Sequence, residues 1–324
     1  MSAAATLIRE AWELLAQLCQ VALVVAIAPG VTGLIRKMKA RLQRRRGPPI
    51  WQPYRDLRRL LGKDAVVAEG TSWLFRAAPY AVFATTWVAA ALVPTFKTQL
   101  MFSWSGDLIA IVALLGLARF LQATAAIDSG TAFGGIGASR EIMIASLAEP
   151  AMIMVVFTLS LVAGSTQLST VAHFMNTAGE LRLPLAMALL GLIIVALAEN
   201  TRIPIDNPAT HLELTMVHEA MLLEYSGRHL AMMDLAASLR MVLYISLIIC
   251  IFAPIGIVTQ DLSPVADIVA VILYLGKVAI ACLLLAIFEM ATAKMRLFRV
   301  PNLLGIALML GLLGTLLLFV SGEM

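Results

Sequence analysis

Charged residues are scarce in this 324-residue chain, and hydrophobic residues dominate it. Asp, Glu, Lys and Arg together make up 14% of the residues, whereas 60% are hydrophobic. A soluble domain of this composition would not have enough polar side chains to cover its surface. The shortage of charge therefore excludes an ordinary soluble enzyme and predicts a polytopic membrane protein.

Cysteine and histidine are also scarce, and their spacing does not fit a metal centre. The three cysteines fall in three different apolar runs, which fits neither an iron–sulfur cluster nor a zinc site and does not favour a disulfide: Cys19, Cys250 and Cys282. His218-Glu219 begins like a zinc-protease motif, but the second histidine is missing. His211 and His218 would lie roughly 10 Å apart along a helix, too far to share one metal. We expect no metal or cofactor on this chain.

A nucleotide-binding loop is missing as well. Glycines are frequent between Asp128 and Arg140, but no β-strand precedes them and the setting is a membrane loop. We interpret this segment as a glycine-rich connection in which backbones pack closely.

Apolar runs of spanning length recur along the chain. The first run is too long for a signal-peptide core and lacks a basic leading region, so it counts as a span. We expect an all-α polytopic membrane protein, a single integral membrane domain over residues 1–324 built as a bundle of eight transmembrane helices. The fifth run is the shortest. The expected spans lie near residues 12–35, 73–95, 106–127, 142–164, 183–199, 238–259, 266–290 and 302–321.

The basic residues are concentrated in one loop. Residues 36–63 hold eleven of the 24 Lys and Arg residues. By the positive-inside rule, the loops 36–72 and 200–237 are cytoplasmic. Both termini then lie on the outer side of the cell (inner) membrane. This topology accounts for the net charge of +4 without a nucleic-acid partner.

One part of the basic loop has helical spacing of apolar residues, with arginines between them. This pattern predicts an amphipathic cytoplasmic loop helix in the membrane interface. It leaves two partners open, lipid headgroups or a cytoplasmic protein. The apolar positions are Tyr54, Leu57, Leu60 and Leu61.

Titratable residues gather in the stretch from Glu199 to His229, which holds five carboxylates and three histidines. Asn207 and Pro208 resemble a helix N-cap and first turn, and Gly227 resembles a C-terminal stop. We therefore expect most of this stretch to be one helix, with its histidines satisfied at an interface rather than bound to metal.

Ionisable residues also fall inside the expected spans. Glu149, before Pro150, and Lys277 lie well within apolar runs, where a charge costs roughly 2.5–3.5 kcal/mol. Such a cost favours a functional role. Glu199 and Glu289 lie at span ends, where pairing with nearby arginines is an equal alternative.

Several motifs together resemble one family, the H-subunit (subunit 1) family of respiratory complex I, and most closely its branch in membrane-bound group 4 hydrogenases of the formate hydrogenlyase and hydrogenase-4 type. These motifs are Arg45-Arg-Gly-Pro, Leu117-Ala-Arg-Phe-Leu-Gln, Gly137-Ala-Ser-Arg-Glu with Ala-Glu149-Pro, and Arg202-Ile-Pro-Ile-Asp with Glu224-Tyr-Ser-Gly. The resemblance covers nearly the whole chain. It departs from the family at Asn207-Pro-Ala-Thr-His-Leu, which replaces much of a denser acidic run.

The resemblance implies a membrane subunit of an oxidoreductase complex, linking a cytoplasmic redox module to proton or other ion translocation. The implied partners are membrane lipid, a hydrogenase-like large subunit, an iron–sulfur small subunit and antiporter-like membrane subunits. The resemblance places iron–sulfur clusters in those partner subunits. It leaves open whether a partner also holds a nickel–iron centre. The expected proton path comprises Glu149, Glu199, Asp206, Glu213, Glu219, Glu224, Lys277 and Glu289. The expected contact with the redox arm comprises Arg44, Arg45, Arg46, Gly47, Pro48, Arg202 and Tyr225.

Three other functions stay open at this point. The chain would also fit the quinone-binding membrane subunit of a respiratory complex I. The charges within its spans would suit a standalone ion transporter. It would be a passive membrane anchor if its acidic residues were dispensable.

Overall fold

The computed structural model describes residues 3–68, 70–98, 103–178, 182–202, 217–258, 264–292 and 299–321. A helix lies over each of the eight expected spans. These helices are α1 (Ala3–Leu42), α3 (Trp73–Leu92), α4 (Leu108–Asp128), α5 (Ala132–Ala163), α7 (Leu183–Glu199), α9 (Gly227–Phe252), α10 (Pro264–Ala291) and α11 (Val300–Ser321).

The fold is that of an all-α polytopic membrane protein. Six of these helices, α1, α4, α5, α9, α10 and α11, are long and apolar enough to cross a membrane. The helix α7 has only 17 residues, and α3 carries Arg76 in its first turn. The expected count of eight spans depends on these two helices, and length and composition do not confirm it.

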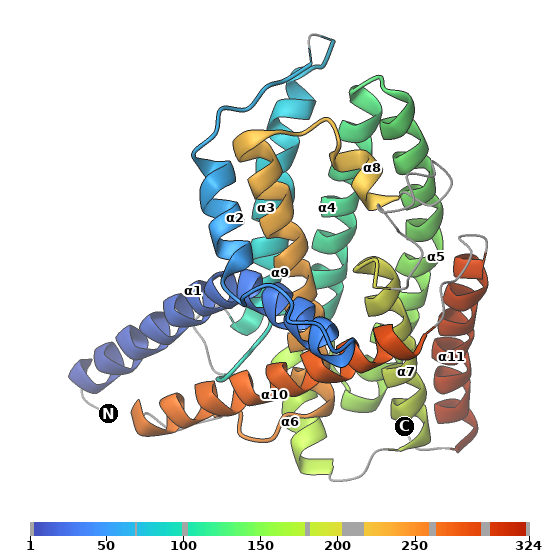
Figure 1. Ribbon diagram of the computed structural model, residues 1–324. Coiled ribbons are helices and arrows are strands. Elements are labelled where there is room, and N and C mark those ends of the chain that lie inside the picture. The colour runs from blue at the N-terminus through green and yellow to red at the C-terminus, as the bar shows by residue number, and fades with distance from the viewer. Residues whose placement is uncertain are drawn as a thin grey trace.

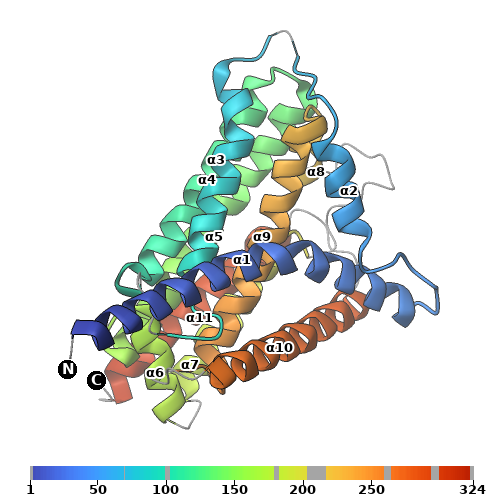
Figure 2. The same cartoon turned by 90° about the vertical axis from the view of Figure 1, so that its left-hand side faces the viewer.

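The helices form two sets with different directions (Figures 1 and 2). One set is a steep bundle, in which α11 packs against α5 and α7, while α3 packs against α4 and α9. The second set is α1 and α10, which pack against each other and cross the bundle. Both termini lie away from α2 (Gln52–Leu61) and α8 (His218–Leu222). A short helix, α6 (Leu168–Ala178), and a 3₁₀ turn at Ser103–Ser105 complete the described elements.

The predicted loop helix is present as α2. Tyr54, Leu57 and Leu60 are half-buried, and Arg55 and Arg58 are exposed. Leu61, which was expected on the apolar face, is exposed as well. The Tyr54 hydroxyl donates to the Ala26 carbonyl at 2.5 Å and so holds α2 against α1. The same loop also meets the turn before α9, because the Ser226 hydroxyl bonds both the amide (2.8 Å) and the carbonyl (3.0 Å) of Val66.

The glycine-rich connection is mostly helix, contrary to our expectation. Thr131 caps α5 by accepting a hydrogen bond from the Gly134 amide at 3.1 Å, so the helix begins before most of the glycines. The expected close packing does occur at Gly137. A Cβ there would lie 2.9 Å from Met221 Cγ and 3.0 Å from the Val217 carbonyl oxygen, and its absence lets α8 rest on α5.

Gly227 opens a helix instead of ending one. It has φ +51°, and an added Cβ would lie 2.4 Å from the Asp64 carbonyl oxygen, so both conformation and space favour glycine. The helix α8 ends at Leu222, five residues earlier, and α9 begins at Gly227. The expected single helix is therefore wrong at this end. Its expected start at Asn207 and Pro208 lies outside the described residues.

A close backbone approach joins α1 to the segment before α2, and it generates a stability prediction. A Cβ on Gly33 would lie 2.2 Å from the Ile50 carbonyl oxygen, so Gly33→Ala must displace that segment. We expect a loss of about 1–3 kcal/mol, typical of overpacking. Thermal unfolding in detergent measures it. Gly305→Ala is the matched control, since that helical glycine has open space around it. Equal midpoints for the two variants would contradict this role of Gly33.

Candidate functional site

A buried ion pair joins three helices in the core. Arg119 of α4 contacts Glu199, at the end of α7, with 2.6 Å between Nη2 and Oε1. Their side chains are 4% and 1% exposed. The Tyr244 hydroxyl of α9 donates a short hydrogen bond to the other oxygen of Glu199. A buried ion pair stabilises a fold only when further hydrogen bonds satisfy its atoms, and Tyr244 supplies one.

Glu149 of α5 also approaches the guanidinium of Arg119. Its Oε1 lies 3.7 Å from Arg119 Nη2, and its side chain is 42% exposed. With Glu141 it lines a groove of about 210 Å³ between α4 and α5. Gly116 makes room for this carboxylate, which would lie 3.3 Å from an added Cβ. Arg119 thus faces two carboxylates, one inside the bundle and one at its surface.

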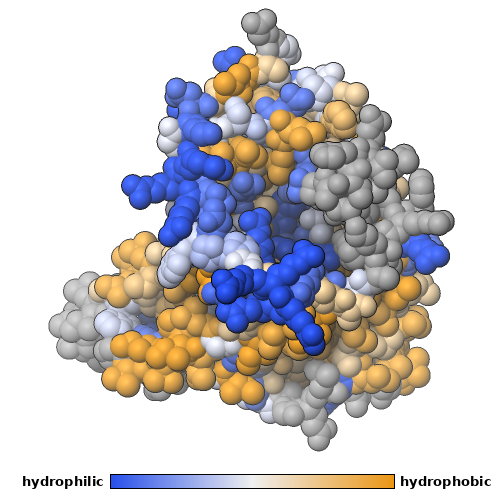
Figure 3. Space-filling view, viewed as in Figure 1, coloured by the Kyte–Doolittle hydropathy of each residue, from blue (hydrophilic) through white to orange (hydrophobic). Residues whose placement is uncertain are grey.

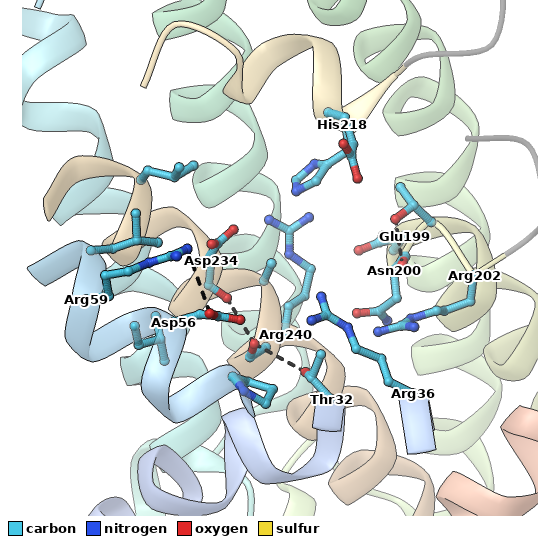
Figure 4. Close-up of a pocket in the computed structure, with 18 residues that line it drawn as sticks. Thr32, Arg36, Asp56, Arg59, Glu199, Asn200, Arg202, His218, Asp234 and Arg240 are labelled. Carbon is cyan, nitrogen blue, oxygen red and sulfur yellow. Dashed lines mark hydrogen bonds and ion pairs between the residues drawn. The ribbon is translucent and has the colours of Figure 1, made fainter. Parts of the chain in front are cut away.

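Glu199 also lines a polar cavity of about 520 Å³ between α1, α2, α8, α9 and the end of α7 (Figure 4). Hydrophilic side chains surround a hollow on this face, and hydrophobic surface lies below it (Figure 3). Arginines and carboxylates in equal number line the cavity: Arg36, Arg59, Arg202 and Arg240 with Asp56, Glu199, Glu219 and Asp234. The Arg119–Glu199 pair therefore stands between this cavity and the α4–α5 groove.

A second hydrogen-bonded chain begins at the cavity wall. Arg240 Nη2 donates to Gln122 Oε1 at 3.2 Å, and Gln122 Nε2 lies 3.1 Å from His218 Nδ1. Burial, followed by the positive charge of Arg240, lowers the pKa of His218 to about 3. The imidazole is consequently neutral at physiological pH, and its Nδ1 accepts a hydrogen bond from the Gln122 amide. This agrees with the expectation of a satisfied interfacial histidine.

The other expected proton-path residues lie in several places. Glu219 lines the cavity, and Glu224 is half-buried in the turn before α9. Glu289 bonds Lys39 at 2.5 Å and Arg202 at 3.4 Å, so it pairs with cations from α1 and from the end of α7. Asp206 and Glu213 lie outside the described residues.

Lys277 is distant from these groups. Its ammonium donates to the carbonyls of Ala253, at 2.7 Å, and Ile255. Ala253 follows the C-terminus of α9, thirteen residues beyond Arg240, which is roughly 20 Å along a helix. The structure therefore gives Lys277 the role of capping α9 and does not bring it to the Arg119 group.

The expected redox-arm residues divide into exposed and buried groups. Residues 44–48 are exposed and follow the end of α1, where the Arg45 amide bonds the Ala40 carbonyl at 2.8 Å. Tyr225 instead stacks on Phe75 with ring centroids 4.2 Å apart, and its hydroxyl bonds the Phe75 carbonyl at 3.3 Å. Burial raises the pKa of this phenol. Its position indicates packing rather than direct contact with a partner.

Four residues of this site are not among the residues predicted from the sequence: Arg119, Gln122, Glu141 and Tyr244. The first three lie within the motifs that carry the family resemblance, and a charge within a span was a further signal for Arg119. Tyr244 carries no such signal, because a tyrosine in an apolar helix resembles any other packing residue. Only the meeting of α4, α7 and α9 reveals it.

The described residues hold no group of three or more His, Cys, Asp or Glu side chains placed to bind a metal. The three cysteines are free thiols. The titratable side chains of the site are carboxylates, arginines, a histidine and a tyrosine, groups that can hold and move protons.

These features define a class of protein: polytopic membrane proteins in which buried ionisable residues connect a polar cavity to a groove on the side of the helix bundle, here the α4–α5 groove. The family described as NADH dehydrogenase matches residues 15–320, and the chain belongs to that family.

Two relatives come from Escherichia coli (strain K12). Hydrogenase-4 component C is 34% identical, over 86% of this chain and 87% of its own length. Formate hydrogenlyase subunit 4 is 31% identical, over 88% of this chain and 92% of its own length. A chain of the membrane-bound sulfane sulfur reductase, an archaeal respiratory membrane complex, shares the fold at a TM-score of 0.75 and 21% identity, covering 93% of this chain and 98% of its own.

The low pKa of His218 generates a pH prediction. Its folded pKa is below the value near 6.5 of an unfolded histidine, so the unfolded state takes up the proton first as the pH falls. The stability contributed by neutral His218 is complete above pH 6.5 and declines below it, by at most about 1.4 kcal/mol per pH unit. Thermal unfolding between pH 5 and 8 should show a shallower decline for His218→Asn, which keeps an acceptor but does not titrate. His173→Asn, at an exposed histidine of α6, is the control and should follow the wild type.

Proposed function

We propose that this protein is the membrane subunit that links a cytoplasmic redox module to proton translocation in an energy-converting complex related to complex I. Its relatives include hydrogenase-4 component C and formate hydrogenlyase subunit 4. In this proposal, partner subunits perform the electron transfer. This chain converts their redox state into a movement of charge within the membrane.

The line of ionisable groups from the polar cavity to the lateral groove supports this function most strongly. Glu199 lines the cavity, Glu149 lines the groove, and Arg119 lies between them. A cation favours the ionised form of whichever carboxylate it approaches more closely. A small movement of Arg119 from Glu199 toward Glu149 would therefore favour proton uptake at Glu199 and proton release at Glu149.

The exposure of Glu149 supports a membrane partner. A carboxylate facing lipid at this depth would cost roughly 2.5–3.5 kcal/mol, so its groove is better covered by protein than by acyl chains. We propose that an antiporter-like membrane subunit covers the α4–α5 face and accepts protons from Glu149.

The exposed arginine turn supports a partner at the other end. Residues 44–48 are exposed, and the amides of Arg44 and Arg45 bond carbonyls at the end of α1. We propose that this turn contacts the hydrogenase-like and iron–sulfur subunits. Both termini then lie outside the inner membrane, opposite the cytoplasmic loops.

The quinone-binding alternative receives less support from the cavity. Eight of its lining residues are charged, and only five are apolar: Pro53, Leu57, Leu60, Leu230 and Ala237. Ligand pockets for small molecules are lined mainly by apolar side chains, whereas this lining suits water and ions. The cavity therefore fits a proton entrance better than a quinone site.

The proposed path predicts the effect of Glu149→Gln. Glutamine keeps the shape of the side chain and removes its titratable group, so proton translocation per redox turnover should fall at least about tenfold while assembly persists. Proton uptake by inverted vesicles containing the whole complex measures this ratio. Glu13→Gln, at a carboxylate of α1 away from the path, is the control and should leave the ratio unchanged. Full coupling in Glu149→Gln would reject this path.

A further inference from the structure

An apolar groove lies on the membrane side of the polar cavity. Its volume is about 370 Å³, and it lies where α10 crosses α7 and α9 (Figure 1). Aliphatic and aromatic side chains form most of its wall, among them Ile193, Ile248, Leu285 and Phe288. Leu284 is 62% exposed in the groove wall, so the groove opens sideways toward the bilayer. Such a wall suits a hydrocarbon chain.

One end of this groove is polar and cationic. Asn200 and Arg202 line both the groove and the polar cavity, and therefore form the boundary between them. Among the described residues, Arg202 and Lys39 share one carboxylate, Glu289. Arg36 also acts electrostatically on Arg202, but Asp234 faces Arg36. The pairing at Glu289 thus joins two cations to one carboxylate and leaves one positive charge.

Arg202 has unused capacity to bind an anion. Its Nη1 contacts Glu289 at a long 3.4 Å, and its Nε is buried without a hydrogen bond among the described residues. Burial lowers the pKa of this guanidinium, and Glu289 only partly opposes that effect. A desolvated guanidinium is stabilised by a further anionic acceptor, and phosphate oxygens match its planar donors.

We propose that this groove is a binding site for one anionic phospholipid, with an acyl chain between α7, α9 and α10 and its phosphate at Arg202. The occupant follows from the two ends of the groove, since an apolar wall open to the bilayer and a cationic end together match an anionic lipid. The bound lipid would cover the sideways opening beside Asn200 and Arg202 and so separate the polar cavity from the membrane interior.

Lipid titration of the assembled complex tests this site. The complex is delipidated in detergent and titrated with phosphatidylglycerol or phosphatidylcholine, and bound lipid is counted by native mass spectrometry. We expect one tightly held phosphatidylglycerol and weaker binding of phosphatidylcholine. Arg202→Gln should weaken phosphatidylglycerol binding at least about tenfold, because it removes the charge-assisted bonds to phosphate.

A second pair of variants keeps the test decisive if Arg202→Gln does not assemble. Ala281→Phe fills the groove, whereas Ile280→Phe places the same ring at a residue outside it that is 60% exposed. We expect Ala281→Phe to lose the tightly held lipid and Ile280→Phe to keep it. The proposal is overturned if these two variants bind phosphatidylglycerol equally, if Arg202→Gln binds it as the wild type does, or if a quinone displaces the lipid.

Discussion

The Arg119–Glu199 ion pair is the interaction on which the rest of the structure depends. It joins α4 to the end of α7, and Tyr244 adds α9 to the same contact. Removing one partner of a buried pair leaves an uncompensated charge and commonly costs about 3–5 kcal/mol. The pair is consequently a structural junction, and it lies between the polar cavity and the groove at Glu149.

The two directions of helices explain how a membrane protein can contain a charged cavity. The polar cavity lies where the crossing helix α1 meets α9 and the end of α7 in the steep bundle, with α2 and α8 beside it. Charges of its lining are paired: Arg202 with Glu289 at 3.4 Å, and Arg59 with Asp56 at 3.8 Å. Pairing lowers the free-energy cost of each charge, so charged side chains persist beside apolar helices.

Much of the fold is predictable from the sequence, because long apolar runs have few alternatives to helices in a bilayer. The sequence also drew attention to Glu149, since a charge in such a run is costly, and to Glu199, for which pairing with an arginine was an equal alternative. The arginine turn followed instead from the family resemblance. The connections were less predictable. Gly227 resembled a helix stop, but α9 begins there, and the nearby carbonyl of Asp64 leaves no room for a Cβ. Lys277 had the same signal as Glu149, yet it caps α9. The free-energy cost of a charge in an apolar span does not by itself distinguish a capping residue from a functional one. The distinction depends on which residues, distant in sequence, contact the charge.

The central claim is that Arg119 sets the protonation of Glu149 and Glu199 in response to the redox state of the partner module. Redox-induced infrared difference spectroscopy of the assembled complex tests it most directly, because protonated carboxyl groups have a distinct C=O stretching band. We predict a carboxyl band that changes on reduction in the wild type and is absent in an assembled Arg119→Gln complex. An identical band in the two complexes would contradict this claim.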